Sequence, residues 1–336
     1  MTLALVLILL LVLFLPFMVK LIERNLEAFL FLMGLIAATL SGVLDSTLWM
    51  KALKNPIHIT IVVFIASLLF KWLRNPIRML IQKATRILDI KVFLTLMIVS
   101  LGLLSSVITA IVAAIILVFM ISMLRIDRET EVRAVILSCF AIGFGSVLTP
   151  VGEPLATITT TKLNQDFSFL FHLIGLEAIV GVLSIGIFAI FFLKPKQLEE
   201  AEGGKAYESY SHILSRAIKI YLFVMGLTML GSSYESLVNQ YLLDLNTGIL
   251  FWVNMSSAVL DNATLAAAEI SPAMEVGTIR FILLSLIISG GMLIPGNIPN
   301  IIAANKLGIT SREWVKYGVP LGLVMMSFMF VYLTFN

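Results

Sequence analysis

The sequence predicts an all-α protein that crosses a membrane several times and consists of two inverted structural repeats. Of its 336 residues, 60% are apolar and only 13% are charged, which is about half the charged share of a soluble domain. The apolar residues gather in runs long enough to span a bilayer, which takes about 20 residues of helix. Polar, helix-breaking segments interrupt two of these runs, at 145–154 and at 290–299. A repeated break of this kind is typical of a membrane protein built from two related halves.

The apolar runs define the expected membrane segments. Two of them, 90–124 and 246–270, each contain a Ser-Ser pair, and we expect them to be helical hairpins that enter and leave the membrane on one side. The others are expected to cross. A hairpin and a full double crossing return the chain to the same side, so the pattern leaves re-entrance open. The runs cover residues 3–19, 28–44, 57–72, 90–124, 132–163, 167–193, 212–231, 246–270, 277–305 and 314–335.

The placement of Lys and Arg predicts that the N-terminus lies outside the cell membrane. With that orientation, most of the 23 Lys and Arg residues fall on inner segments, as the positive-inside rule requires. Residues 1–19 lack the basic start and the cleavage site of a signal peptide, so we expect a retained helix. The same orientation puts the ends of the first hairpin inside and those of the second outside. The two repeats therefore have inverted topology. The exceptions on the outer side are Lys51, Lys54, Lys162 and Arg280.

A polar, Gly-containing segment at 194–211 is predicted to be a cytoplasmic linker between a first repeat at 1–193 and a second at 212–336. Within the first repeat, residues 74–88 place three arginines on one helical face and apolar residues on the other. This pattern is typical of a helix that lies in the membrane interface. A support arm for moving parts and a simple surface anchor would both have it. The arginines are Arg74, Arg78 and Arg86.

The two breaks share a pattern of glycine and proline residues. Aligning Gly145 with Gly290 places Pro150 on Pro295 and Pro154 on Pro299. In lipid, irregular backbone survives only where protein buries it or where it lines a cavity, and paired breaks point to the binding site of a secondary transporter. We therefore predict one broken helix within 132–163 and another within 277–305.

Asp261 is the strongest candidate for a functional residue, because an ionisable group deep in an apolar run is costly unless it has a role. Its neighbours offer hydroxyl, amide and backbone oxygens, which hard cations such as sodium prefer. A structural alternative is a helix N-cap, in which Asp261 accepts hydrogen bonds from free N–H groups; the two roles are compatible. The predicted ligand set here is Ser256, Ser257, Asp261, Asn262 and Thr264.

Glu153 is the second candidate. Two prolines flank it and prevent a continuous helix, and the break frees carbonyls and half-helix N-termini for ion binding. The alternative is a hydrated Glu153 in an outer surface loop. We predict a sodium site at Asp261 and Glu153. The further polar residues assigned to it are Thr149 and Gly152 beside Glu153, Ser105, Ser106 and Thr109 in the first hairpin, and Asn297 and Asn300 in the second break.

Other titratable residues carry weaker signals. Glu177 lies within a predicted span and is a possible member of a proton relay through a partner on a neighbouring helix. Cys139 stands alone in an apolar setting, which excludes an internal disulfide. Four acids fall near predicted outer ends of spans, where we expect them to be solvated: Glu235, Asp244, Glu269 and Glu275.

At these breaks the chain resembles the ion-transporter superfamily of inverted-repeat carriers. That group includes NhaD-type sodium/proton antiporters, arsenite permeases and citrate symporters. Ser257-Ala-Val-Leu-Asp261-Asn262 is similar to the Ser-Ala-x-x-Asp-Asn hairpin tip of the NhaD-type branch. Thr149-Pro150-Val-Gly152-Glu153-Pro154 is similar to the superfamily's Thr-Pro-x-Gly-Asp/Glu break. The resemblance places the chain in an uncharacterised prokaryotic branch of cation transporters. It implies a scaffold, a transport subdomain with two hairpins and two broken helices, and a homodimer.

Cation/proton antiport by alternating access is the leading functional hypothesis, because it predicts acids at the repeated breaks. A sodium-coupled anion symporter, or an arsenite-type permease, is the second. A membrane enzyme is disfavoured, since the three histidines are scattered and no nucleophile–base pair is readable. A passive channel would not need paired inverted breaks. The expected partners are the lipid bilayer and a small inorganic ion, with no nucleic acid and no bound cofactor beyond transported or coupling Na⁺ and H⁺.

Overall fold

The computed structural model describes residues 2–124, 126–196, 210–241 and 245–335. All regular structure in these residues is helical, and several helices are long and apolar enough to cross a membrane. The predicted class of an all-α polytopic membrane protein is therefore confirmed. The first part of the chain comprises α1 (Thr2–Met18), α2 (Lys20–Arg24), α3 (Leu26–Leu40), α4 (Ser46–Ile87), α5 (Ile90–Ile108), α6 (Ala110–Met123), α7 (Arg128–Ser146), α8 (Pro154–Leu163) and α9 (Phe169–Phe192).

The second part repeats this plan with fewer helices before its hairpin. It comprises α10 (Tyr210–Tyr241), α11 (Thr247–Val253), the 3₁₀ turn η1 (Asn254–Ser256), α12 (Ser257–Leu260), α13 (Asn262–Glu269), α14 (Val276–Gly290), the 3₁₀ turn η2 (Ile294–Gly296), α15 (Ile298–Leu307) and α16 (Ser311–Phe335). The predicted linker at 194–211 lies outside the described residues except at its two ends.

Five helices meet the length and hydropathy needed for a full span, whereas the sequence predicted eight crossings in addition to the hairpins. The remaining apolar helices among the described residues are shorter, at 10–17 residues. Four predicted crossings are absent from the five: α1 and α3 have only 17 and 15 residues, and the runs at 132–163 and 277–305 are each divided into two half-helices. Conversely, the candidate span Ile90–Ile108 is an arm of the first hairpin. The five candidate spans are Ser46–Ile65, Ile90–Ile108, Phe169–Phe192, Ile213–Glu235 and Ser311–Phe335.

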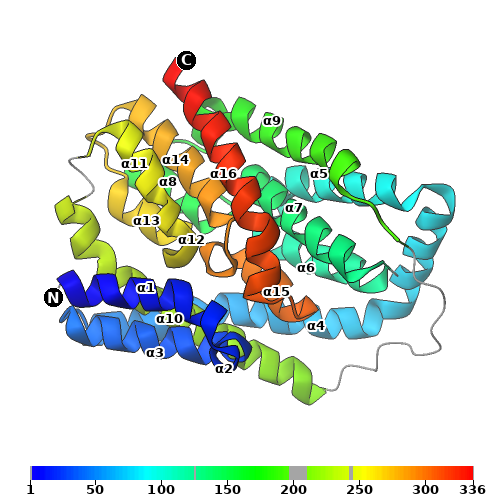
Figure 1. Ribbon diagram of the computed structural model, residues 1–336, viewed down its shortest axis with the longest axis horizontal. Coiled ribbons are helices and arrows are strands. Elements are labelled where there is room, and N and C mark those ends of the chain that lie inside the picture. Colours follow the sequence, from blue (N-terminus) through cyan, green and yellow to red (C-terminus); the bar gives the residue numbers. More distant parts are fainter. Residues whose placement is uncertain (1, 125, 197–209, 242–244, 336) are drawn as a thin grey trace.

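Helix α4 is longer than the apolar run from which it was predicted. It begins at Ser46 because the Asp45 carboxylate accepts the Leu48 N–H at 2.7 Å and caps the first turn. It then continues to Ile87, so the interfacial helix expected at 74–88 is the end of α4 rather than a separate element. Figure 1 shows this end turning away from the rest of the helix before α5 begins. The side chains of its arginines lie outside the described residues.

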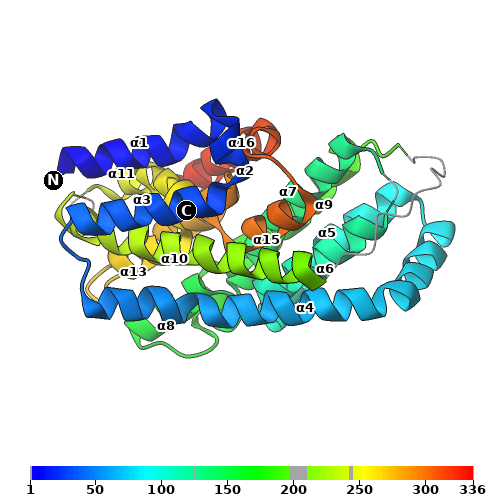
Figure 2. The same ribbon diagram turned by 90° about the horizontal axis from the view of Figure 1, so that it is seen from below.

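Helices α1, α3, α4 and α10 run side by side along the long axis of the molecule (Figure 2). Helices α3 and α10 approach closely where two glycines meet, since a Cβ on Gly34 would lie 2.5 Å from the carbonyl oxygen of Gly226. Hydroxyls join the other members: Tyr234 donates to the Leu5 carbonyl at 2.7 Å, and Tyr221 donates to the Leu53 carbonyl at 2.9 Å. This layer forms one side of the protein, and the two hairpins and two broken helices form the other (Figure 1).

Each hairpin turns at a single residue in the left-handed region of the backbone. Thr109 joins α5 to α6 with φ 75°, and Asp261 joins α12 to α13 with φ 73°. Such angles are rare for residues other than glycine. In both cases the side chain accepts a hydrogen bond from the N–H three residues later, in Val112 and Thr264. The two hairpin tips are therefore built in the same way. The first hairpin opens toward one end of the molecule and the second toward the opposite end (Figures 1 and 2).

The two broken helices also match each other, but one residue away from the predicted alignment. Helices α8 and α15 both have ten residues, and they end at the left-handed residues Asn164 and Gly308, which are 144 positions apart. The predicted pairing of Gly145 with Gly290 is therefore wrong by one residue, and Glu153 corresponds to Asn297 rather than to Ile298. Helix bounds reveal this, whereas the proline spacing did not.

The second half of each broken helix packs against the hairpin of the other repeat. Helix α8 packs against α13 of the second hairpin, and α15 packs against α6 of the first. At one end of the molecule the Lys162 ammonium donates to the carbonyls of Ala267 and Ile270 at the end of α13. Each break is thereby held in place by the hairpin of the other repeat, and both breaks lie near the middle of the long axis (Figure 1).

Candidate functional site

The structure brings Glu153, Asn297 and Asp261 together where the two broken helices and the second hairpin meet. Glu153 precedes α8 and Asn297 precedes α15, and both have extended backbone that leads into the half-helix. The polar neighbours of the Glu153 carboxyl are Ser146, Asn297 and Asp261, and none of them forms a hydrogen bond with it. Residues from both repeats therefore converge on one place.

Glu153 is only 4% exposed, and neither of its carboxylate oxygens has a hydrogen-bond partner. The alternative prediction, a hydrated Glu153 in a surface loop, is therefore wrong. The loop that carries it exposes Val151, but at Gly152 it folds back against Ser146 in the last turn of α7, and the Glu153 side chain is buried. A buried carboxylate without a partner is costly in a membrane protein, so these oxygens are available for a ligand.

Asp261 both caps a helix and faces the site. One carboxylate oxygen accepts the Thr264 N–H at 3.3 Å and the Thr264 hydroxyl at 3.2 Å. The side chain is half-buried. The N-cap that the sequence suggested is therefore confirmed, and the role of Asp261 as a cation ligand stays a prediction. Asp261 is also the left-handed residue at the hairpin tip. Its hydrogen bonds to Thr264 therefore hold both the turn and the carboxylate in place.

The other predicted residues of the second hairpin differ in their surroundings. The Ser257 hydroxyl is buried and lies 2.5 Å from the Ser289 hydroxyl of α14, so it fastens the hairpin to the broken helix. Asn262 is buried against Gly290, and its amide nitrogen has no hydrogen-bond partner. Ser256 is half-buried beside them. Asp261 and Asn262 are thus the residues of this hairpin that can still form polar contacts at the second break.

The hydroxyls of the first hairpin are engaged in holding the first break. Ser105 donates to the Gly102 carbonyl at 2.6 Å and lies 3.1 Å from the Ile142 carbonyl, while Ser106 donates to Leu103. Thr149 donates to the Ser106 carbonyl at 2.5 Å. The Thr109 hydroxyl caps α6. These residues were predicted as ligands, and in the structure they form hydrogen bonds with the protein's own backbone.

Glycines allow each break to fold back on its own helix. A Cβ on Gly152 would lie 1.8 Å from the Ser146 carbonyl oxygen, and one on Gly296 would lie 2.5 Å from the Gly290 carbonyl oxygen. In the second break, the Asn300 amide donates to the carbonyls of Gly290 and Leu293 at 2.8 Å each. Asn300 therefore satisfies carbonyls that the broken helix leaves free. Gly296 was not predicted, because the alignment of the breaks was displaced by one residue.

Glu177 has a partner on a neighbouring helix, as the sequence suggested it could. It forms an ion pair with Arg280 of α14, and the Arg280 guanidinium lies 5.8 Å from the Tyr332 ring. The pairing explains why a carboxylate is tolerated within the span α9. Its predicted role in a proton relay stays a prediction.

Sequence reasoning missed a buried polar cluster between the second hairpin and α14, and it misplaced Glu269. Asn254, Ser285 and Ser289 are fully buried and hydrogen-bonded together. The i, i+4 spacing of Ser285 and Ser289 in an apolar run was the available signal. Glu269 was expected to be solvated, but it is 0% exposed, because α13 is short and its end is covered by neighbouring helices.

A cavity of about 510 Å³ leads from one end of the molecule toward the second break. It is bordered by Glu27, Lys219 and Asn305, with Ile294 at its inner limit. Glu27 accepts a hydrogen bond from Asn305 at 2.5 Å and lies 3.8 Å from the Lys219 ammonium. A smaller space next to it reaches Val259 and Pro295, beside the tip of the second hairpin. Both spaces adjoin the second break, at Ile294 and Pro295.

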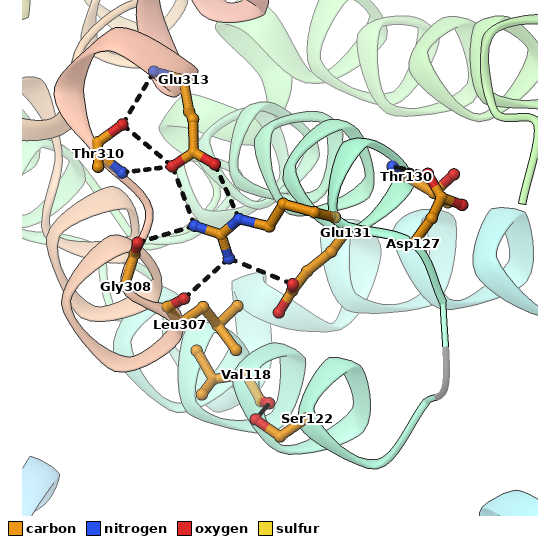
Figure 3. Close-up of polar contacts among 10 residues, drawn as sticks. Val118, Ser122, Asp127, Thr130, Glu131, Leu307, Gly308, Thr310 and Glu313 are labelled. Carbon is orange, nitrogen blue, oxygen red and sulfur yellow. Dashed lines mark hydrogen bonds and ion pairs between the residues drawn. The ribbon is translucent and has the colours of Figure 1, made fainter. Parts of the chain in front are cut away.

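At that same end, Arg128 ties the start of α7 to the end of α15 and the start of α16 (Figure 3). Its guanidinium donates to Glu313 at 2.8 and 2.9 Å and to the carbonyls of Leu307 and Gly308 at 3.0 and 2.8 Å. Glu131 completes the cluster. Through these contacts Arg128 joins the two broken helices.

We predict that Glu313→Gln lowers the melting temperature of the purified protein. The substitution removes the charged partner of the Arg128 guanidinium, and the Glu313 carboxylate also accepts hydrogen bonds from the Thr310 N–H and hydroxyl. Hydrogen bonds to charged groups are about twice as strong as neutral ones. Glu235→Gln, which alters an exposed carboxylate on α10, serves as the control. Equal melting temperatures for Glu313→Gln and Glu235→Gln would contradict this account.

The fold and the site define the class of the protein: an all-α membrane protein in which two broken helices and two hairpins surround the buried Glu153 and the half-buried Asp261. The chain belongs to the family described as protein of unknown function (DUF1646), whose model matches residues 2–335. A comparison with curated proteins finds no significant match.

Proposed function

We propose that the protein is a secondary active transporter that exchanges a cation, sodium in the first instance, for protons by alternating access. The observation that carries this proposal is the meeting of Glu153 and Asp261 from different repeats, with the Glu153 oxygens buried and unpartnered. Two carboxylates near each other without a basic partner are stable only when a cation or protons neutralise them. Competition between a cation and protons for this one site is the chemical basis of exchange.

The ligands offered at this place suit a hard cation, which prefers oxygen. Glu153 and Asp261 supply carboxylate oxygens, and Asn297 supplies an amide beside them. The transported ion would be cargo that is bound and released, rather than a permanent part of the protein. The resemblance at the hairpin tip and at the break supports the same class of function.

The inverted arrangement of the hairpins supports alternating access. Because each half-helix packs on the hairpin of the other repeat, the two breaks and two hairpins would move as one body against the layer of α1, α3, α4 and α10. The cavity lined by Glu27, Lys219 and Asn305 would be the path on one side. We further propose that the protein lies in the cell membrane with its N-terminus outside, so that this cavity opens to the cytoplasm.

Sodium-coupled uptake of an anion is a second candidate, and one observation favours it. Neither Glu153 nor Asn297 caps its own half-helix, so N–H groups at the starts of α8 and α15 lack a side-chain acceptor there. Such groups bind anions. The acidic neighbours at the same place favour a cation.

The test is transport in proteoliposomes with an imposed acid-inside pH gradient. Sodium, lithium, potassium or calcium is added outside, and the collapse of the gradient is followed with a fluorescent dye. We expect collapse with sodium or lithium in protein-containing vesicles and none in empty ones. If folded protein responds to none of the four cations, antiport is wrong, and sodium-dependent uptake of labelled anions is measured next.

A further inference from the structure

Glu269 and Asn254 form a second buried polar site, apart from the two breaks. Glu269 occupies the last turn of α13, and Asn254 begins the 3₁₀ turn η1 in the other arm of the second hairpin. Both side chains are 0% exposed. The two Glu269 oxygens and the Asn254 side-chain oxygen all lack a hydrogen-bond donor, and the two side chains lie beside each other. The site therefore holds three buried acceptors and no donor for them.

No neighbouring cation among the described residues neutralises Glu269. Among the described side chains, the charged groups on the helices packed against α13 are Lys162 of α8, Glu235 and Lys219 of α10, and Arg280 of α14, and Glu153 directly precedes α8. Lys162 donates to the backbone carbonyls of Ala267 and Ile270, and Arg280 pairs with Glu177. Glu235 is exposed, and Lys219 pairs with Glu27. An isolated ionised carboxylate in such surroundings would be prohibitively costly.

A hydrogen-bonded chain of hydroxyls extends from this site toward the hairpin tip. The Asn254 side-chain amide donates to the Ser285 hydroxyl at 3.0 Å, and the Ser289 hydroxyl donates to the Asn254 backbone carbonyl at 2.9 Å. Ser289 in turn lies 2.5 Å from the Ser257 hydroxyl, four residues before Asp261. These groups form a continuous polar line between α14 and the second hairpin in an otherwise apolar interior.

We infer that Glu269 is a proton-binding group, held as a carboxylic acid whose O–H donates to the Asn254 side-chain oxygen. A bound proton converts one of the three acceptors into a donor and removes the buried charge in one step. The proton is taken from water as H⁺ and returned as H⁺, with no other bond changed. A metal cation fits less well, because hard cations take about six oxygen ligands, and this site offers three. The inference stands without the proposed transport function.

The test is infrared spectroscopy of the full-length protein in lipid, which detects the C=O stretch of protonated carboxyl groups. We expect Glu269→Gln to remove one such band at neutral pH. Glu275→Gln, which alters an exposed carboxylate six residues away, should leave that band in place. Asn254→Leu removes the acceptor and should shift the band to higher frequency, so it reports on the site even if Glu269→Gln does not fold.

Two outcomes would overturn the inference. One is a Glu269→Gln spectrum identical to wild type at neutral pH, or an unshifted band in Asn254→Leu. The other is a Glu269 band that disappears when sodium is added at constant pH, which would identify a cation as the occupant. Neither readout requires transport, so failure here is distinct from failure of the antiport assay.

Discussion

Asp261→Asn is expected to abolish sodium-dependent collapse of the pH gradient while the protein remains folded. The substitution keeps the size of the side chain and an oxygen that can accept the Thr264 hydrogen bonds, but it removes the charge that neutralises a bound cation. Removing one partner of a buried charge pair costs about 2–5 kcal/mol. A loss of about 3 kcal/mol weakens binding on the order of a hundredfold. Glu153→Gln should have an effect of similar size, because Glu153 faces the same place.

Asp166→Asn is the matched control, since Asp166 is an exposed carboxylate near the end of α8. Its gradient collapse should equal that of wild type. Melting temperatures of the three variants establish that they are folded. If Asp261→Asn transports sodium as wild type does, the carboxylate is only a helix cap, and the proposed site is wrong.

Gly145→Ala is expected to be the most disruptive small substitution in the first repeat. A Cβ at this position would lie 1.7 Å from the Gly102 carbonyl oxygen of α5, so two helix backbones would have to separate. Overpacking of this kind costs typically about 1–3 kcal/mol even where side chains can adjust, and backbone adjusts less. We expect a melting temperature several degrees lower in detergent, together with reduced transport, because the last turn of α7 supports the loop that carries Glu153.

Gly277→Ala provides the comparison. Gly277 lies in the first turn of α14, and a Cβ there would meet no heavy atom within 4 Å. Alanine in a helix is favoured over glycine by about 0.5–1 kcal/mol, so this variant should melt at the wild-type temperature or slightly above it. Equal melting temperatures for both alanine variants would mean that α5 and α7 are not in the close contact described.

The symmetry of the protein could be predicted from sequence in outline because helix breaks in an apolar background are conspicuous. Two prolines around Glu153 and the Asp-Asn pair at 261–262 marked the right places. The detailed pairing failed because prolines tolerate a shift of one residue, whereas the caps of α8 and α15 do not. The left-handed tip residue Asp261 carried an ambiguous signal, since the same residue type suits a helix cap and a cation ligand.

The burial and the hydrogen-bond partners of polar side chains could not be predicted from the sequence. Glu269 lies close to the end of an apolar run and reads as a surface residue, but α13 has only eight residues and its end is covered by packing from other parts of the chain. Conversely, Ser105 and Thr149 read as ligands because they are polar, and the structure shows both donating to backbone carbonyls of α5. Tertiary contacts decide which polar groups remain free, and no local pattern records them.

Direct measurement of sodium binding to the purified protein is the most decisive test of the site formed by Glu153 and Asp261. Calorimetric titration in detergent, or retention of ²²Na⁺, should reveal saturable binding in wild type. Binding should weaken on the order of a hundredfold in both Asp261→Asn and Glu153→Gln, following the loss of one charged ligand, and persist in Asp166→Asn. Undiminished sodium binding in both site variants would show that the two carboxylates do not form the cation site.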